Sequence, residues 1–240
     1  MALGSQPRWT VRPAAAQVGI DVGLREYMLR IYNYMASGLA LTGIVAYLAA
    51  TSGLYYYLAT RAQPLLWLVI LAPLGLVMLM SFRLQQMRAS TLQAVFWLYA
   101  GLMGLSLAAV FLVFTGASIA RVFFITAGTF AAMSLYGYTT QRDLTQFGSF
   151  LFMGLIGIII AGLVNMFIAS SALQFAISVI GVIVFVGLTA WDTQQIKEMY
   201  YAADDYEMGS KKAVMGALRL YLDFINLFMM LLQLFGQRRD

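Results

Sequence analysis

The sequence contains no cysteine and no histidine. The absence of cysteine excludes disulfides and thiol nucleophiles, and the absence of both residues excludes zinc sites built from them. Without imidazole, a response to pH near neutrality has to come from other groups, such as carboxylates in an unusual environment. Charge is also scarce: 10% of the 240 residues are charged and 62% are hydrophobic. This composition excludes a disordered chain, argues against a water-soluble enzyme, and predicts a protein embedded in lipid.

The few charged residues divide the chain into long apolar windows. Charge-free windows cover residues 31–60, 62–82, 89–120, 122–141 and 144–191. Because about 20 apolar residues cross the hydrocarbon core as a helix, the last window is too long for one span and is predicted to fold back near residues 169–171. We therefore predict an all-α polytopic membrane protein with seven transmembrane helices, at about 31–50, 65–82, 92–114, 121–138, 149–168, 172–191 and 214–235.

Residues 1–23 are predicted to form a mobile cytoplasmic tail and residues 24–240 the membrane domain. No cleavable signal peptide is evident, because no apolar segment precedes the first arginines. If the N-terminus is cytoplasmic and all seven segments cross, ten lysines and arginines lie on the cytoplasmic side and four outside, as the positive-inside rule requires. The pair Arg238 and Arg239 would lie outside, so a re-entrant segment 214–235 is the alternative. No basic cluster with interleaved aromatics is present, and we expect no nucleic-acid partner.

Ionisable residues inside the spans are the strongest functional candidates, because a charge in lipid is costly. Asp192 ends the sixth span, and Asp223 lies about two turns into the seventh. Since the sixth helix runs toward the cytoplasm and the seventh starts there, both carboxylates are predicted at similar depth. A facing pair could share one proton or offer hard oxygen ligands to calcium.

Simpler interpretations of these residues stay open. Asp192 could face the headgroups and water, and Arg219 could form an ion pair with Asp223, four residues away on the same helical face. Arg83, at the cytoplasmic end of the second span, could be an ordinary positive-inside anchor or a counter-ion for one of the aspartates.

Three segments resemble the Bax inhibitor-1 family (transmembrane Bax inhibitor motif proteins), particularly its bacterial members. Residues 221–228 (YLDFINLF), followed by leucine-rich sequence and Phe235-Gly236, look like the family's C-terminal signature. Residues 191–197 (WDTQQIK) are similar to its second acidic motif, and residues 32–43 to its first helix. The resemblance covers roughly residues 24–236.

The resemblance implies a seven-helix fold in which the last helix is surrounded by the other six. It also implies a pH-sensitive calcium leak, with the family's acidic pair at Asp192 and Asp223 and its closed-state arginine latch at Arg83. The chain lacks the denser basic run that often follows that arginine. Arg219, Tyr221 and Asn226 are possible supporting residues.

The leading hypothesis is therefore a calcium-leak channel of the bacterial inner membrane, gated by protonation of the Asp192–Asp223 pair. It needs no cofactor, calcium being the permeant or bound ion, and we expect no enzymatic activity. An intramembrane aspartyl protease is less favoured, because such enzymes carry a GxGD motif and Asp223 follows Leu-Tyr-Leu. The remaining alternative is a non-conducting protein that regulates a membrane protease or a stress response through contact. The sequence does not indicate an oligomeric state.

Overall fold

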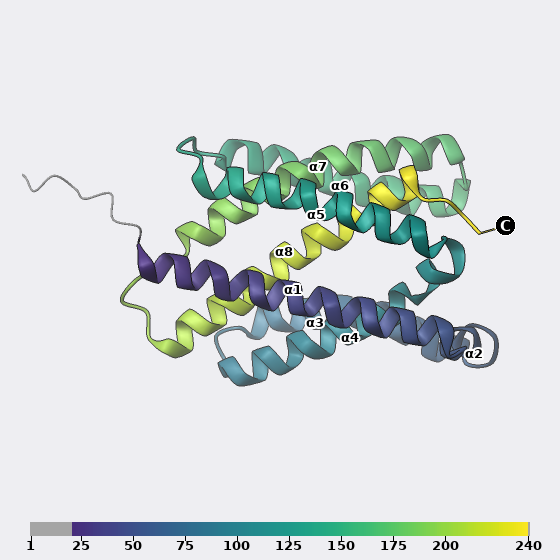
Figure 1. Ribbon diagram of the computed structural model, residues 1–240, viewed down its shortest axis with the longest axis horizontal. Coiled ribbons are helices and arrows are strands. Elements are labelled where there is room, and N and C mark those ends of the chain that lie inside the picture. The colour runs from purple at the N-terminus through teal and green to yellow at the C-terminus, as the bar shows by residue number, and fades with distance from the viewer. Residues whose placement is uncertain (1–20, 240) are drawn as a thin grey trace, which may run out of the picture.

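The computed structural model describes residues 21–239 and consists of helices joined by short loops (Figure 1). The eight helices are α1 (Val22–Thr51), α2 (Leu54–Arg61), α3 (Gln63–Arg83), α4 (Ala89–Val113), α5 (Gly116–Thr139), α6 (Thr145–Ile168), α7 (Ser171–Glu198) and α8 (Tyr206–Phe235). All except α2 are long and apolar enough to cross a membrane. The prediction of an all-α protein with seven transmembrane helices is confirmed. The predicted N-terminal tail falls almost entirely outside the described residues.

Several helices are longer than the predicted spans, and most of the extra residues lie at the end of the bundle where α1 begins. There α1 begins nine residues before the predicted span, and α7 and α8 are longer by seven and eight residues. The predicted limits followed the charge-free windows, whereas a helix continues into water as long as its backbone is hydrogen-bonded. The predicted turn after the fifth span is present, with Ala169 in the left-handed conformation (φ 51°) and Ser170 capping α7.

Helix α8 crosses obliquely between two groups of helices, with α1, α3 and α4 on one side and α5, α6 and α7 on the other (Figure 1). It packs extensively against α1, α4, α5 and α7, while α3 packs mainly against α4, and α6 against α7. Of the residues in its most apolar window, 67% are buried, compared with 17% in α3 and in α6. Four helices therefore shelter α8 closely, and a complete enclosure by all six stays a prediction.

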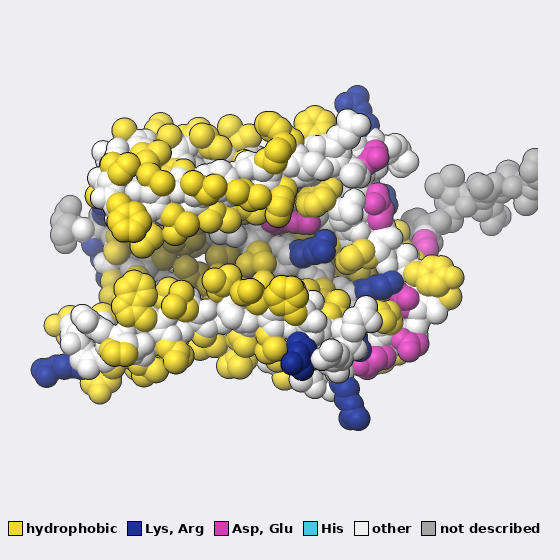
Figure 2. All heavy atoms as spheres, turned by 180° about the vertical axis from the view of Figure 1, so that it is seen from behind, with side chains coloured by type: hydrophobic (Ala, Val, Ile, Leu, Met, Phe, Trp, Pro, Cys, Tyr) yellow, Lys and Arg dark blue, Asp and Glu magenta, His cyan; other side chains and the backbone are white. Residues whose placement is uncertain are grey.

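The outer faces of the bundle suit a lipid environment. Figure 2 shows apolar side chains over most of the length of the molecule and charged side chains gathered toward the ends. The acidic side chains concentrate at one end (Figure 2), which is the end formed by the start of α1 and the loop between α7 and α8. Figure 2 also shows an acidic and a basic side chain together in a hollow away from the ends. On the face shown in Figure 2, charge away from the ends is thus confined to a small region.

Candidate functional site

The two predicted aspartates lie on packed neighbouring helices. Asp192 is near the end of α7, and Asp223 lies in the middle of α8. The Asp223 residue is 5% exposed, and its Oδ2 has no hydrogen-bond partner among the described residues. The Asp192 side chain is 14% exposed. The two carboxyl groups lie close to each other where α7 and α8 pack. The structure therefore brings the predicted pair together, and its role stays a prediction.

Arg219 is the cation beside this pair. Its Nη1 lies 3.9 Å from Oδ1 of Asp192, across the interface between α8 and α7. This distance is that of a loose ion pair rather than a hydrogen bond. Because the Arg219 side chain is 46% exposed, such a pair contributes at most about 1 kcal/mol. Arg219 lies one turn before Asp223, yet its ion pair within the described residues is with the neighbouring helix.

Arg83 lies apart from the aspartates in this structure. It is the last residue of α3, its side chain is exposed, and it forms no ion pair within residues 21–239. Helix α3 packs against α4 and α2 and has no extensive contact with α7 or α8. A latch at Arg83 would therefore need another arrangement of α3, and that role stays a prediction.

A chain of hydroxyl groups begins next to Asp192 and was not foreseen from the sequence. Thr193 donates to the carbonyl of Thr189 (2.7 Å), and its hydroxyl also lies 3.0 Å from that of Ser134. The Ser134 hydroxyl lies in turn 2.6 Å from that of Tyr32. The chain joins α7, α5 and α1. The position of Thr193 directly after Asp192 is the one sequence signal that could have drawn attention to it.

The two supporting residues predicted on α8 have different contacts. The Tyr221 hydroxyl lies 2.7 Å from that of Thr42, which also lies 2.9 Å from the Ala100 carbonyl oxygen. This buried contact joins α8 to α1 and α4, two residues before Asp223 in the sequence. The Asn226 amide donates to the Leu222 carbonyl of its own helix (2.8 Å) and makes no hydrogen bond to either aspartate within the described chain. Tyr221 thus contributes to packing around the site, and Asn226 lies outside the pair's contacts.

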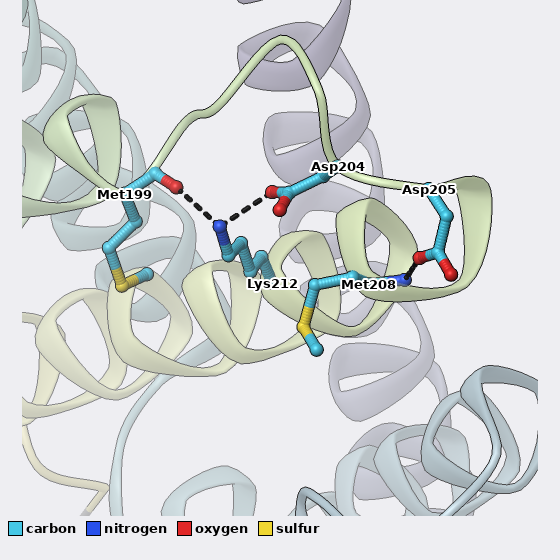
Figure 3. A network of polar contacts seen from close by, with 5 residues as sticks. All are labelled: Met199, Asp204, Asp205, Met208 and Lys212. Carbon is cyan, nitrogen blue, oxygen red and sulfur yellow. Dashed lines mark hydrogen bonds and ion pairs between the residues drawn. The ribbon is translucent and has the colours of Figure 1, made fainter.

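The connection between α7 and α8 fixes how the two aspartate-bearing helices meet. Lys212 of α8 donates to the Met199 carbonyl at the end of α7 (3.0 Å) and pairs with Asp204 of the loop (2.5 Å; Figure 3). Asp205 accepts from the Met208 backbone N–H (2.7 Å) and caps the start of α8 (Figure 3). A positive charge near a helix C-terminus and a carboxylate at an N-terminus both stabilise those ends.

The pair by itself could supply only part of a calcium coordination sphere. Within residues 21–239, no three acidic, histidine or cysteine side chains lie so that they could hold a metal ion together. Calcium takes six to eight oxygen ligands, so water and backbone oxygens would have to complete the shell around Asp192 and Asp223. Such a site suits weak, transient binding rather than permanent retention of the ion.

Comparison with known proteins shows the relationship that the motifs suggested. Residues 24–240 match the family model described as inhibitor of apoptosis-promoting Bax1. The chain belongs to the Bax inhibitor-1 family. It is 52% identical to the uncharacterized protein RP147 of Rickettsia prowazekii over 92% of this chain and 93% of the relative. It is also 50% identical to the inner membrane protein YbhL of Escherichia coli K12, over 90% of this chain and 94% of the relative.

The family relationship agrees with the architecture. A protein of Streptococcus pyogenes serotype M3, the uncharacterized membrane protein SpyM3_0260, is 36% identical over 90% of this chain and 95% of its own length. The family model matches residues 24–240, a range that spans the seven apolar helices apart from the first two residues of α1. The chain is thus a multi-pass membrane protein of the Bax inhibitor-1 family.

Proposed function

We propose that this protein is a passive calcium leak of the bacterial inner membrane, and that Asp192 and Asp223 form its proton- and calcium-responsive site. The observation that carries the proposal is the pair of carboxyl groups where α7 and α8 pack: one buried oxygen of Asp223 has no partner within residues 21–239, and Arg219 lies beside Asp192. The 50% identity to the inner membrane protein YbhL supports the location.

Charge balance explains why this site would respond to cations. Two ionised carboxylates and one guanidinium leave one negative charge in excess, and uncompensated charge inside a membrane is costly. A shared proton cancels that excess, and a calcium ion replaces it by one positive charge. Competition between these two cations at one pair makes calcium movement sensitive to pH without histidine.

The ion pair between Arg219 and Asp192 supplies a way to couple the site to helix packing. It joins α7 to α8 at 3.9 Å, and protonation of Asp192 would remove its Coulombic part. Because a partly exposed pair contributes no more than about 1 kcal/mol, one protonation changes a two-state equilibrium by about fivefold at most. We propose that the pair favours a closed arrangement, so that calcium flux rises as pH falls. Arg83 could replace Arg219 as the counter-ion in a state where α3 is displaced.

In the proposed orientation the N-terminus is cytoplasmic and α8 crosses the whole membrane. Within residues 21–239, eight lysines and arginines lie toward the end that holds the α1 start, and this excess supports the orientation. The 30-residue length of α8 supports a full crossing, because at about 1.5 Å per residue it spans roughly 45 Å. Both aspartates would then be reached from the cytoplasmic half of the membrane.

Calcium flux into liposomes loaded with a fluorescent indicator tests the proposal. The Asp192→Asn, Asp223→Asn double variant should lose the pH dependence of the flux, because neither amide titrates or forms an ion pair with Arg219. Asp143→Asn is the matched control, because Asp143 is an exposed loop carboxylate that accepts from the Thr145 backbone N–H. Undiminished, pH-responsive flux in the double variant would refute the proposed site. Absence of flux with the unmodified protein would refute the leak and favour a regulatory role.

A further inference from the structure

A groove runs along the membrane-facing side of the bundle between α1 and α5. These two helices flank α8 (Figure 1) and make no extensive contact with each other. Three adjoining cavities of about 340, 620 and 300 Å³ follow one another between them. The first two share Tyr32 and Phe130 as lining residues, and the second and third share Gly43 and Phe224. They therefore adjoin along one groove, and α8 lines the second and third of them.

The interior of the groove is apolar and open. Small residues of α1 face aromatic residues of α5 and α8 across it; they are Ala36, Ala40, Gly43, Phe123, Phe130 and Phe224. A Cβ atom built at Gly43 meets no atom within 4 Å, so the protein itself leaves this space unfilled. An extended hydrocarbon chain has the shape and polarity to occupy it.

The mouth of the groove, at the end where α1 begins, is basic. Arg25 lines the first cavity, is exposed, and has no ion pair or side-chain hydrogen bond within residues 21–239. No carboxylate lines that cavity. Lys197 of α7 donates a hydrogen bond to the backbone carbonyl of Tyr138 (2.9 Å), which also lines this cavity, and so adds a second positive charge near the mouth. Just inside the mouth lie the paired hydroxyls of Tyr32 and Ser134.

The basic mouth, the apolar interior and the length of the groove match an anionic phospholipid. The α1 stretch from Arg25 to Leu39 spans roughly 21 Å at about 1.5 Å per residue, which exceeds one leaflet's half of a hydrocarbon core about 30 Å thick. Basic pockets between transmembrane helices favour anionic lipid head groups. Hydroxyl groups below the mouth would lie at the level of the ester linkages.

We propose that this groove is a binding site for an anionic phospholipid from the leaflet on the side of the α1 start. Its phosphate contacts Arg25, and one acyl chain lies between α1 and α5 against Phe224. Phe224 is 3% exposed and directly follows Asp223. The lipid therefore covers α8 beside the aspartate pair. The site is independent of the proposed calcium leak, since its geometry involves neither aspartate.

Native mass spectrometry of the full chain tests the site. After delipidation, the protein is titrated with phosphatidylglycerol and with phosphatidylethanolamine of the same acyl chains. Wild type should bind phosphatidylglycerol about fivefold more tightly, as one arginine contact allows. Arg25→Gln should reduce this preference to about one. Arg88→Gln, an exposed arginine at the same end outside the groove, should leave it unchanged.

A second variant tests the acyl-chain part of the groove. Gly43→Leu should weaken binding of both lipids by at least fivefold, because the new side chain fills the open space. Gly75→Leu is the matched control, since a Cβ at Gly75 in α3 also meets no atom within 4 Å. Equal binding of the two lipids to wild type, or unchanged binding to both Arg25→Gln and Gly43→Leu, would overturn the proposal. A dimer that excludes lipid from the groove would overturn it too, because a second chain would then be the occupant.

Discussion

The contact between Gly137 of α5 and Ala190 of α7 gives the sharpest structural prediction for this protein. A Cβ atom built at Gly137 lies 2.1 Å from the carbonyl oxygen of Ala190, 2.8 Å from its carbonyl carbon and 2.9 Å from its Cα. All three are backbone atoms, which no rotamer change can move. Since ordinary Cβ contacts begin at 3.4 Å, Gly137→Ala forces the two helices apart by about 1 Å. Small residues at such crossings are what allow membrane helices to approach closely.

The expected cost follows from two opposing effects. Overpacking a close contact costs about 1–3 kcal/mol, whereas replacing a helical glycine by alanine gains up to about 1 kcal/mol in helix propensity. Gly128 of the same helix provides the control, because a Cβ there meets no atom within 4 Å. We therefore expect Gly137→Ala to lower the apparent melting temperature in detergent by several degrees, and Gly128→Ala to leave it unchanged or raise it slightly.

Size-exclusion chromatography after heating measures both variants in the same detergent. Because Ala190 lies two residues before Asp192, Gly137→Ala should also change calcium flux in liposomes, whereas Gly128→Ala should not. Equal melting temperatures for Gly137→Ala and wild type would show that α5 and α7 are not in the close contact described. Equal losses in both alanine variants would show that the effect belongs to α5 itself rather than to this contact.

Three further predictions concern the polar residues. Thr42→Val and Tyr221→Phe should each cost about 0.6–1.7 kcal/mol in detergent unfolding, as interhelical hydrogen bonds in membranes do, and the double variant should cost less than the sum because both remove one contact. Arg219→Gln should raise calcium flux at neutral pH by up to about fivefold. Arg83→Gln should leave the flux unchanged if the described arrangement is the resting one. Raised flux in Arg83→Gln together with unchanged flux in Arg219→Gln would favour the Arg83 latch. Hydrogen bonds from Thr145, at the start of α6, lower the pKa of Asp143 below its ordinary value of 3.8. Any stabilisation that ionised Asp143 gives is therefore present above pH 3.8 and is lost only as the pH falls below that value. Asp143→Asn should accordingly leave the flux profile between about pH 5 and 8 unchanged.

The sequence predicted the helical architecture well because one physical rule dominates it. Charges are excluded from lipid, so the charge-free windows locate the spans without any knowledge of their packing. The same rule placed Asp192 and Asp223 at similar depth, since α7 and α8 run in opposite directions through the membrane. The structure adds that α7 and α8 pack against each other. The positions of the aspartates in the sequence could not predict that contact.

The hydroxyl chain beside Asp192 illustrates what could not be predicted. Tyr32, Ser134 and Thr193 come from three helices and are separated by more than 50 residues at each step. Serine and threonine are common in membrane helices, where most of them donate to their own helix one turn back, as Thr193 does to Thr189. Only the rotation of each helix about its axis decides whether such a hydroxyl also faces a neighbour. That rotation depends on side-chain packing rather than on the apolar pattern.

The partner of Arg219 depends on the same rotation. An arginine four residues before an aspartate has that carboxylate on its own helical face, so an ion pair with Asp223 was one alternative that the sequence left open. In the structure Asp223 is 5% exposed, while the Arg219 side chain is 46% exposed and extends toward Asp192 at the α7 surface. A guanidinium stays partly hydrated wherever it can, and reaching Asp223 fully would require it to give up that water. The arginine therefore pairs with the more accessible carboxylate, and the buried Asp223 forms no ion pair within residues 21–239.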